Sequence, residues 1–301
     1  MRPKGLIRLL LTGCLLLLLS GCTFGATVDA LLTPPHLRGE QEQIYQALEN
    51  AVGNRITLQY PRSGDHLSAV MISDLDGDGQ DEAAVFYRKE SSLSTENALR
   101  LNLLDQADGT WMSVCDLPAE GAEVDRGFTA DIGGRQRLII GYSQVDQSDK
   151  ALVVYNYEGG TLAKSFTVSY SSFDVADLDG DDQSELLILK AAEGEHAAEA
   201  AVYVPDEQDH YTRYSLTLQG KTTEYSQVLC GNTQGKQTAI YLDGIVGATT
   251  MQTEVLQFDG KKLSYLVPTG SDAVSTIRPT GWLTMDIDQD DIPEIPVQGL
   301  F

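Results

Sequence analysis

The sequence predicts an all-β fold, a β-propeller of four-stranded blades, and three observations support this prediction. First, the acidic pattern Asp-x-Asp-x-Asp-x-x-x-Glu occurs three times in the 301-residue chain. Second, degenerate copies fill the two intervals, which gives motif starts near residues 74, 131, 177, 230 and 286, a period of roughly fifty residues. Third, continuous apolar runs follow these loops. Repeats of this length are typical of propellers, solenoids and other arrays.

The chain begins with a segment that resembles the leader of a bacterial lipoprotein. Three basic residues precede an apolar run from Leu9 to Leu19, which is too short to span a bilayer but fits a signal peptide. The run ends in Leu19-Ser20-Gly21-Cys22, which resembles the lipobox, whose cysteine is lipidated. The resemblance implies a signal peptide over residues 1–21, lipidation of Cys22, and an extracytoplasmic protein anchored to the membrane of the bacterial cell envelope. An ordinary signal peptide is the alternative.

Two short segments separate this leader from the repeats. Residues 22–38 are expected to form a flexible tether. Residues 39–52 carry apolar side chains at spacings of four, from Ile44 to Val52, which predicts an amphipathic helix that lies on a larger body. The remaining residues, 53–301, are assigned to the propeller repeats.

The strands predicted after the loops are apolar on consecutive residues, as in 83–87, 138–142 and 186–189. One-sided sheets alternate apolar and polar residues, so both faces of these strands are expected to be covered. Blades stacked face to face around an axis provide that cover. Each repeat also contains a hairpin signal about thirty residues after its motif start. These signals are Asp108-Gly109, Gly159-Gly160, Pro205-Asp206 and Asp259-Gly260. A strand, a loop, a second strand and a hairpin make a four-stranded repeat.

The count of repeats predicts an incomplete propeller. Four full repeats start near residues 67, 125, 171 and 224, and a fifth contains only its first strand, its acidic loop and the segment Glu294–Val297. Blades turn by about 51° in a seven-bladed ring and by about 72° in a five-bladed one. We expect the smaller angle, hence a truncated seven-bladed ring with an open C-terminal edge. Residues 55–60 could supply one outer strand to the terminal repeat, and pairing there would instead close a five-membered ring.

The acidic loops place carboxylates at positions 1, 3, 5 and 9, from which they can converge on one hard cation. Calcium accepts about six to eight oxygen ligands and tolerates irregular geometry, and a divalent ion would remove the repulsion between these acids. An EF-hand is excluded because its loop needs helical flanks and a glutamate at position 12, where this chain has Val85, Ile188 and Val297. A set of solvated acidic turns without metal is the alternative.

These loops between strands, at blade spacing, resemble the calcium loops of FG-GAP/VCBS repeat proteins, which have the integrin-alpha N-terminal β-propeller fold. The resemblance covers residues 53–301, although no Phe-Gly/Gly-Ala-Pro signature is intact and two of the five loops lack the acids. In the third acidic loop Gln289 and Asp291 replace Gly77 and Gly79, which makes this site the weakest, because glycine adopts positive φ without cost. The resemblance implies structural Ca²⁺ on Asp74, Asp76, Asp78 and Glu82, on Asp177, Asp179, Asp181 and Glu185, and on Asp286, Asp288, Asp290 and Glu294.

The charge balance excludes nucleic acid as a partner. The chain has 44 acidic and 21 basic residues and a formal net charge of −23, so its surface repels nucleic acid and attracts cations. Cys115 and Cys230 lie outside the leader and match no zinc motif, and they are expected to be buried thiols.

The sequence nominates no catalytic residue. The segment 141–145 lacks the last glycine of a Gly-x-Ser-x-Gly elbow, and 105–111 has Ala107 where an Asp-box needs aspartate, so it is interpreted as a hairpin turn. The four histidines lack ligand spacing and are expected at the surface: His36, His66, His196 and His210. We therefore expect a binding or scaffolding module with a protein or glycan ligand rather than an enzyme. A polysaccharide hydrolase or lyase and an envelope assembly component that docks other proteins are the alternatives.

Overall fold

The computed structural model describes residues 39–89, 99–144, 150–233, 235, 237–266 and 276–297. The chain divides into two units, Met1–Glu42 and Gln43–Phe301, and all the sheets belong to the second. The predicted signal peptide, the tether and Cys22 lie outside the described residues. Within the described part of the chain, no helix has the length and apolar character needed to cross a membrane.

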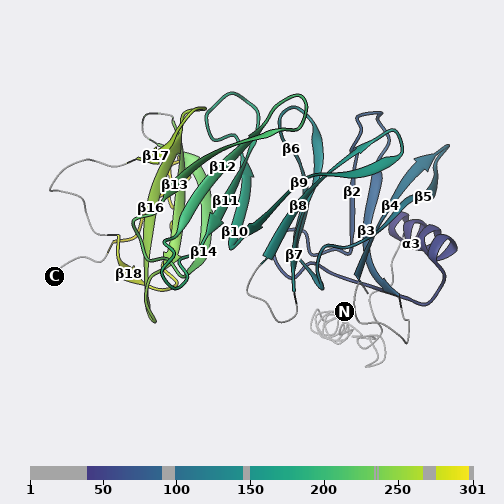
Figure 1. Cartoon of the computed structure of the whole chain (residues 1–301), viewed down its shortest axis with the longest axis horizontal. Coiled ribbons are helices and arrows are strands. Elements are labelled where there is room, and N and C mark those ends of the chain that lie inside the picture. The colour runs from purple at the N-terminus through teal and green to yellow at the C-terminus, as the bar shows by residue number, and fades with distance from the viewer. Residues whose placement is uncertain are drawn as a thin grey trace, which may run out of the picture. The chain divides into compact units, whose positions relative to one another are not determined.

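Four antiparallel sheets, which we call blades one to four, follow one another in chain order (Figure 1). Blade one contains β1 (Ile56–Leu58), β2 (Val70–Ser73), β3 (Glu82–Lys89), β4 (Leu99–Ala107) and β5 (Thr110–Pro118). Blade two contains β6 (Glu123–Asp131), β7 (Gln136–Ser143), β8 (Lys150–Glu158) and β9 (Thr161–Tyr170). Blade three contains β10 (Ser172–Ala176), β11 (Glu185–Lys190), β12 (Glu199–Pro205) and β13 (Tyr211–Thr217). Blade four contains β14 (Glu224–Asn232), β15 (Thr238–Ile245), β16 (Thr250–Phe258) and β17 (Leu263–Tyr265), and β18 (Arg278–Pro279) is attached to it.

Within each blade the strands follow the predicted order. Blades two, three and four have the sheet orders β6-β7-β8-β9, β10-β11-β12-β13 and β14-β15-β16-β17. In every blade the acidic or degenerate loop joins the first strand to the second, and a hairpin joins the third to the fourth. The predicted all-β fold of four-stranded propeller blades is confirmed, and the number of blades in a ring stays a prediction.

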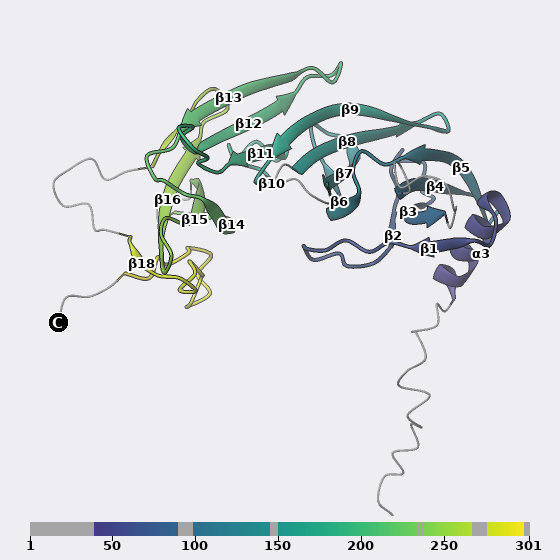
Figure 2. The same ribbon diagram turned by 60° about the horizontal axis from the view of Figure 1, so that its bottom comes forward.

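The β4–β5 and β8–β9 hairpins, which Figure 2 shows, each turn through two consecutive residues in the left-handed region. Asp108 and Gly109, between β4 and β5, have φ angles of 52° and 73°. Gly159 and Gly160, between β8 and β9, have φ angles of 57° and 77°. Positive φ at both central residues is the requirement of a type I′ turn, whose twist matches that of the flanking strands. The interpretation of 105–111 as a hairpin turn is confirmed.

The second strand of each blade is covered on both faces, as its sequence predicts. Six consecutive residues are buried in β3, β7 and β15, and five in β11. Neighbouring residues of β7 contact different blades, because Leu138 and Ile140 share a core cluster with blade one while Ile139 shares one with blade three. In the same way Leu187 packs toward blade four and Ile188 toward blade two. Consecutive apolar residues of one strand therefore pack into two separate cores, one on each face of the blade.

The predicted amphipathic helix is present as α3 (Glu40–Val52) and lies on blade one. Ile44 and Leu48 are fully buried, in one cluster with Val85 and Trp111 of the sheet. The opposite side of the helix is polar and exposed. This cluster is on the face of blade one that blade two does not cover, so the helix closes that face.

Residues 55–60, which could have supplied an outer strand to the terminal repeat, belong to blade one instead. These residues contain β1, which pairs antiparallel with β3 of blade one, with Ile56 opposite Lys89 and Leu58 opposite Tyr87. β2 pairs with the other half of β3, from Val70 opposite Val85 onward. Because β4 occupies the opposite edge of β3, β1 and β2 together fill the first strand position of blade one. The loop between them divides what is one continuous strand in the other blades.

The segment that follows blade four is held to it by a buried ion pair. The side chains of Arg278 and Asp243 are fully buried, and Nη2 of Arg278 lies 2.8 Å from Oδ1 of Asp243. Asp243 also accepts hydrogen bonds from Thr253 Oγ1 and from the backbone and hydroxyl groups of Thr284. Beyond Thr284, an isolated bridge between Met285 and Glu294 encloses the third acidic loop. Five large apolar side chains of this region are exposed: Ile277, Trp282, Met285, Ile287 and Val297.

The cysteines and histidines partly follow expectation. Cys115 and Cys230 are free thiols, and both are half-buried rather than fully buried. Cys230 is part of β14 in blade four. Burial raises the pKa of its thiol to about 12, so the thiol is protonated at neutral pH. Three histidines are exposed, as predicted: His66, His196 and His210, while His36 lies outside the described residues.

Candidate functional site

The first aspartate of each acidic loop holds the backbone of its own loop. Asp74 accepts hydrogen bonds from Gly77 N at 2.7 Å and Gly79 N at 3.0 Å. Asp177 accepts from the backbone nitrogens of residues 180, 181 and 182, and Asp286 from those of residues 289, 290 and 291. These bonds coil the chain around one carboxylate, and they explain why the pattern begins with aspartate.

The glutamate at position 9 reaches back into the same loop from the start of the second strand. Glu82 Oε2 accepts a hydrogen bond from Leu75 N at 2.7 Å, and Glu185 Oε2 accepts one from Leu178 N at 2.8 Å. Glu294 makes the equivalent bond to Ile287 N. Each glutamate is placed by strand pairing, since it lies opposite the residue that precedes the first aspartate.

The three loops bring carboxylate oxygens together as the pattern predicts. In each group, one ligand atom from every residue lies within 4.8 Å of the others. The groups are Asp74, Asp76 and Asp78; Asp177, Asp179 and Glu185; and Asp286, Asp288 and Asp290. Three of the twelve predicted ligands are not in these groups: Glu82, Glu294 and Asp181. Glu82 and Glu294 make the backbone bonds just described. Asp181 instead accepts a bond from Gln183 N and is exposed.

Two buried oxygens in these loops lack a partner, and both belong to predicted ligands. Glu82 is 1% exposed, and its Oε1 has no hydrogen-bond partner although Oε2 has one. Oδ1 of Asp179 is likewise buried without a partner. A buried carboxylate oxygen without a donor or cation costs free energy, so these atoms fit a hard cation that the loop would enclose.

Burial also shifts the protonation of these acids. Desolvation raises the pKa of Glu82 and of Glu185 to about 7, against the bonds from Leu75 and Leu178, which lower it. Desolvation is also the largest cause of the raised pKa of Asp76 and of Asp179. In the exposed third loop the pKa of Asp288 is raised chiefly by the charge of Asp290. In each of these acids the net shift opposes ionisation, and a divalent cation would reverse it.

Backbone conformation ranks the loops as the glycine positions predict. Gly77 and Gly79 in the first loop have φ angles of 79° and 86°. Gln289 and Asp291, at the same positions of the third loop, also have positive φ, 64° and 65°. The second loop is intermediate, because Asp182 has a φ of 67°, which the sequence reasoning overlooked. Non-glycine residues adopt this region at a cost, so the strain rises from the first loop to the third.

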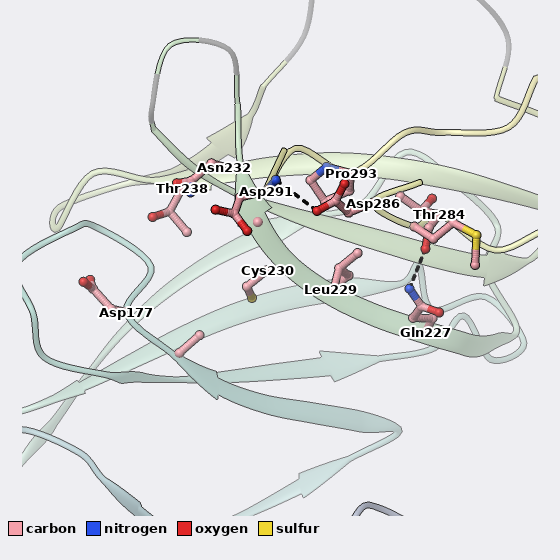
Figure 3. Close-up of a pocket in the computed structure, with 13 residues that line it drawn as sticks. Asp177, Gln227, Leu229, Cys230, Asn232, Thr238, Thr284, Asp286, Asp291 and Pro293 are labelled. Atoms are coloured by element: carbon pink, nitrogen blue, oxygen red, sulfur yellow. Dashed lines mark hydrogen bonds between the residues drawn. The ribbon is translucent and has the colours of Figure 1, made fainter. Parts of the chain in front are cut away.

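A cavity of about 590 Å³ lies between the second and third acidic loops (Figure 3). Its floor is the end of β14, with Gln227, Leu229 and Cys230. Asp177 lies on one side of it and Asp286 on the other, each from an acidic loop. The remaining lining residues are mixed: Asn232, Thr238, Thr284 and Asp291 are polar, whereas Ala176, Gly231, Met285 and Pro293 are not, and no aromatic side chain is among them. No pattern in the sequence predicted this cavity, because its walls come from three repeats.

Comparisons with known proteins bear on the chain as a whole. No family model matches it, and no curated protein matches it. Among solved structures, it is similar to the exotype rhamnogalacturonan lyase YesX, at 14% identity and a TM-score of 0.34 over 72% of this chain and 56% of that one. The rhamnogalacturonan lyase PL11 of Bacillus licheniformis gives 15% identity and a TM-score of 0.34, covering 71% of this chain and 49% of that one. The GH43 β-1,3-galactosidase BT3683 gives 12% identity and a TM-score of 0.33, covering 70% of this chain and 79% of that one. The chain therefore spans about half the length of the two lyases.

Proposed function

We propose that this chain is a lipid-anchored, calcium-stabilised β-propeller that acts as a binding or scaffolding module at the bacterial cell envelope. The observation that carries the proposal is the pair of buried, unpartnered oxygens, Glu82 Oε1 and Asp179 Oδ1, inside two acidic loops. Calcium would be held in the first loop by Asp74, Asp76, Asp78 and Glu82, and in the second and third by the equivalent residues. The ion would supply positive charge that fixes the loop between two strands.

The cavity beside β14 supports a ligand rich in hydroxyl groups. Gln227 and Asn232 offer amide groups there, and Thr238 and Thr284 offer hydroxyl groups. A neutral glycan meets this description. Asp177 and Asp286 are occupied by the amides of their own loops, which favours binding over a role as paired catalytic carboxylates.

Calcium titration tests the metal sites directly. Isothermal calorimetry on the chain at pH 8 should give two tighter sites and one weaker site, with Kd values of about 10⁻⁴ to 10⁻³ M. Asp76→Asn and Asp179→Asn should each remove one of the tighter sites. At pH 6 the affinity should be lower by about tenfold at each of these two sites, because Glu82 and Glu185, with pKa values of about 7, must lose a proton before they bind.

Asp131→Asn is the matched control for that titration. Asp131 occupies position 1 of a degenerate loop and is exposed, so its replacement should leave the number of calcium ions unchanged. Absence of heat on calcium addition, or equal titrations for the wild type and Asp76→Asn, would refute calcium as the occupant.

Membrane anchoring through Cys22 has its own test. Expressed in a bacterial host that processes lipoproteins, the wild-type chain should enter the detergent phase in a phase-separation assay, because each buried CH₂ of an acyl chain contributes about 0.8 kcal/mol. Cys22→Ala should remain in the aqueous phase or keep its leader, whereas Cys14→Ala, in the same leader, should behave as the wild type. Identical partitioning of the wild type and Cys22→Ala would identify the segment as an ordinary leader.

A further inference from the structure

The degenerate loop of blade two has an arginine where the acidic loops have their glutamate. In blades one and three, Glu82 and Glu185 pair with the residues that precede the first aspartate, Ser73 and Ala176. In blade two the residue before Asp131 is Ala130, and its partner across the strands is Arg137. The loop is shorter, but the strand register is the same. Arg137 therefore has the place in the strand pairing that the glutamate at position 9 has in the acidic loops.

The arginine reverses the polarity of the contact that the glutamate makes. Glu82 accepts a hydrogen bond from the backbone nitrogen of the second loop residue, Leu75. Arg137 Nε instead donates to the carbonyl oxygen of the corresponding residue, Ile132, at 2.9 Å. Arg137 is 1% exposed, so its guanidinium brings a permanent positive charge into the place where the acidic loops collect negative charge.

The remaining donors of Arg137 reach oxygen atoms on two blades. Nη1 donates to Asn156 Oδ1 of blade two at 2.7 Å. Nη2 lies 2.6 Å from Oδ1 of Asp209, which belongs to the β12–β13 hairpin of blade three. Asn156 Nδ2 completes the triangle with a bond to Asp209 Oδ2 at 2.5 Å. A buried charge that is paired and hydrogen-bonded can hold two elements in register, and here it joins neighbouring blades.

The same hairpin position meets the loop of the preceding blade elsewhere. In blade four, a Cβ on Gly260 of the β16–β17 hairpin would lie 2.7 Å from Oδ2 of Asp179, in the acidic loop of blade three. In blade two, residues 156–158 before the β8–β9 hairpin share a cavity with Asp76 and Gly77 of blade one. The first and second acidic loops therefore also lie at blade junctions.

We propose that Arg137 is a built-in cation that replaces the divalent ion at the junction of blades two and three. Its pair with Asp209 makes this junction independent of metal, whereas the junctions at the first and second acidic loops depend on it. The comparison with metal loops rests on the proposed function, but the contacts of Arg137 do not.

Thermal unfolding of four chains tests the inference: wild type, Arg137→Met, Asp209→Asn and the double variant, each in 1 mM calcium and in EGTA. Each single variant should lower the melting temperature by several degrees, and by the same amount in both solutions. The double variant should lose less than the sum of the two. Arg135→Met is the control, because Arg135 is 51% exposed and its nearest contact to Asp209 is 3.9 Å. It should change the melting temperature little.

The outcomes separate this inference from the proposed function. Suppose that calcium does not change the melting temperature of the wild type, but the effects of the Arg137 and Asp209 variants remain non-additive in EGTA. The metal proposal then fails, and the ion pair is supported as a link between blades that needs no metal. If calcium stabilises the wild type while the two variants are neutral or additive, the inference fails alone. An effect of Asp209→Asn that appears only with calcium would also overturn it. Should Arg137→Met not fold, Arg137→Lys, which keeps the charge but loses the fork, takes its place in the same cycle.

Discussion

Replacing Arg278 by methionine should lower the free energy of unfolding by about 3–5 kcal/mol, the largest loss expected for any single change outside the apolar core. The substitution leaves Asp243 fully buried without its counter-charge. The two threonine hydroxyls and the amide of Thr284 would still donate to its carboxylate, but hydrogen bonds do not neutralise it. Urea unfolding followed by tryptophan fluorescence measures the loss, since Nε of Arg278 donates a hydrogen bond to the carbonyl oxygen of Trp282.

A surface ion pair provides the matched control. Arg213 lies 2.6 Å from Glu199 on blade three, but both side chains are partly exposed, so Arg213→Met should cost less than about 1 kcal/mol. The double variant Asp243→Asn/Arg278→Met should recover part of the loss, because it removes the uncompensated charge. A cost for Arg278→Met no larger than that for Arg213→Met would show that the buried pair does not hold the C-terminal segment.

Removal of calcium should have an effect of similar size. At 1 mM calcium and a Kd of about 10⁻⁴ M, each of the two tighter sites contributes about 1.4 kcal/mol by linkage, and the weaker third site adds less, so the total is about 3–4 kcal/mol. For a chain of this size the melting temperature should fall by roughly 10 °C in EGTA. Asp76→Ala and Asp179→Ala should reduce this difference more than Asp288→Ala, because the third loop is exposed and strained at Gln289 and Asp291.

Magnesium is the control ion in this experiment. It demands near-octahedral geometry and gives up its water reluctantly, so it should restore much less of the melting temperature than calcium at the same concentration. A melting curve that is the same in calcium, magnesium and EGTA would contradict the assignment of a structural ion.

The repeats were predictable because their signals are local. Each acidic loop carries its own turn, through Asp74 or its equivalents, and each second strand carries its own apolar run. The hairpin at Asp108-Gly109 needs only two residues to specify its turn. Such features depend on spacing along the chain, which a sequence displays directly.

The features that the sequence did not reveal depend on pairing between distant residues. The place of residues 55–60 in blade one could not be predicted, because β1 and β2 share one strand position, which only the register against β3 makes visible. The link from Arg137 to Asp209 spans 72 positions. Arg137 did leave a signal: counting back from Leu138, the first apolar residue of its strand, places it where the other loops have glutamate. Alignment from the first aspartate hid this correspondence because the loop is shorter.

Helix α3 determines from which side the array of blades can grow. Repeat proteins gain stability from nearest-neighbour contacts, and their terminal units need a polar outer surface. Ile44 and Leu48 already fill the free face of blade one, and the outer side of the helix offers exposed polar residues. A further blade can dock on that face only if it displaces the helix. Blade one is thus an end unit by construction, and cooperative folding of the array can extend from it in one direction alone.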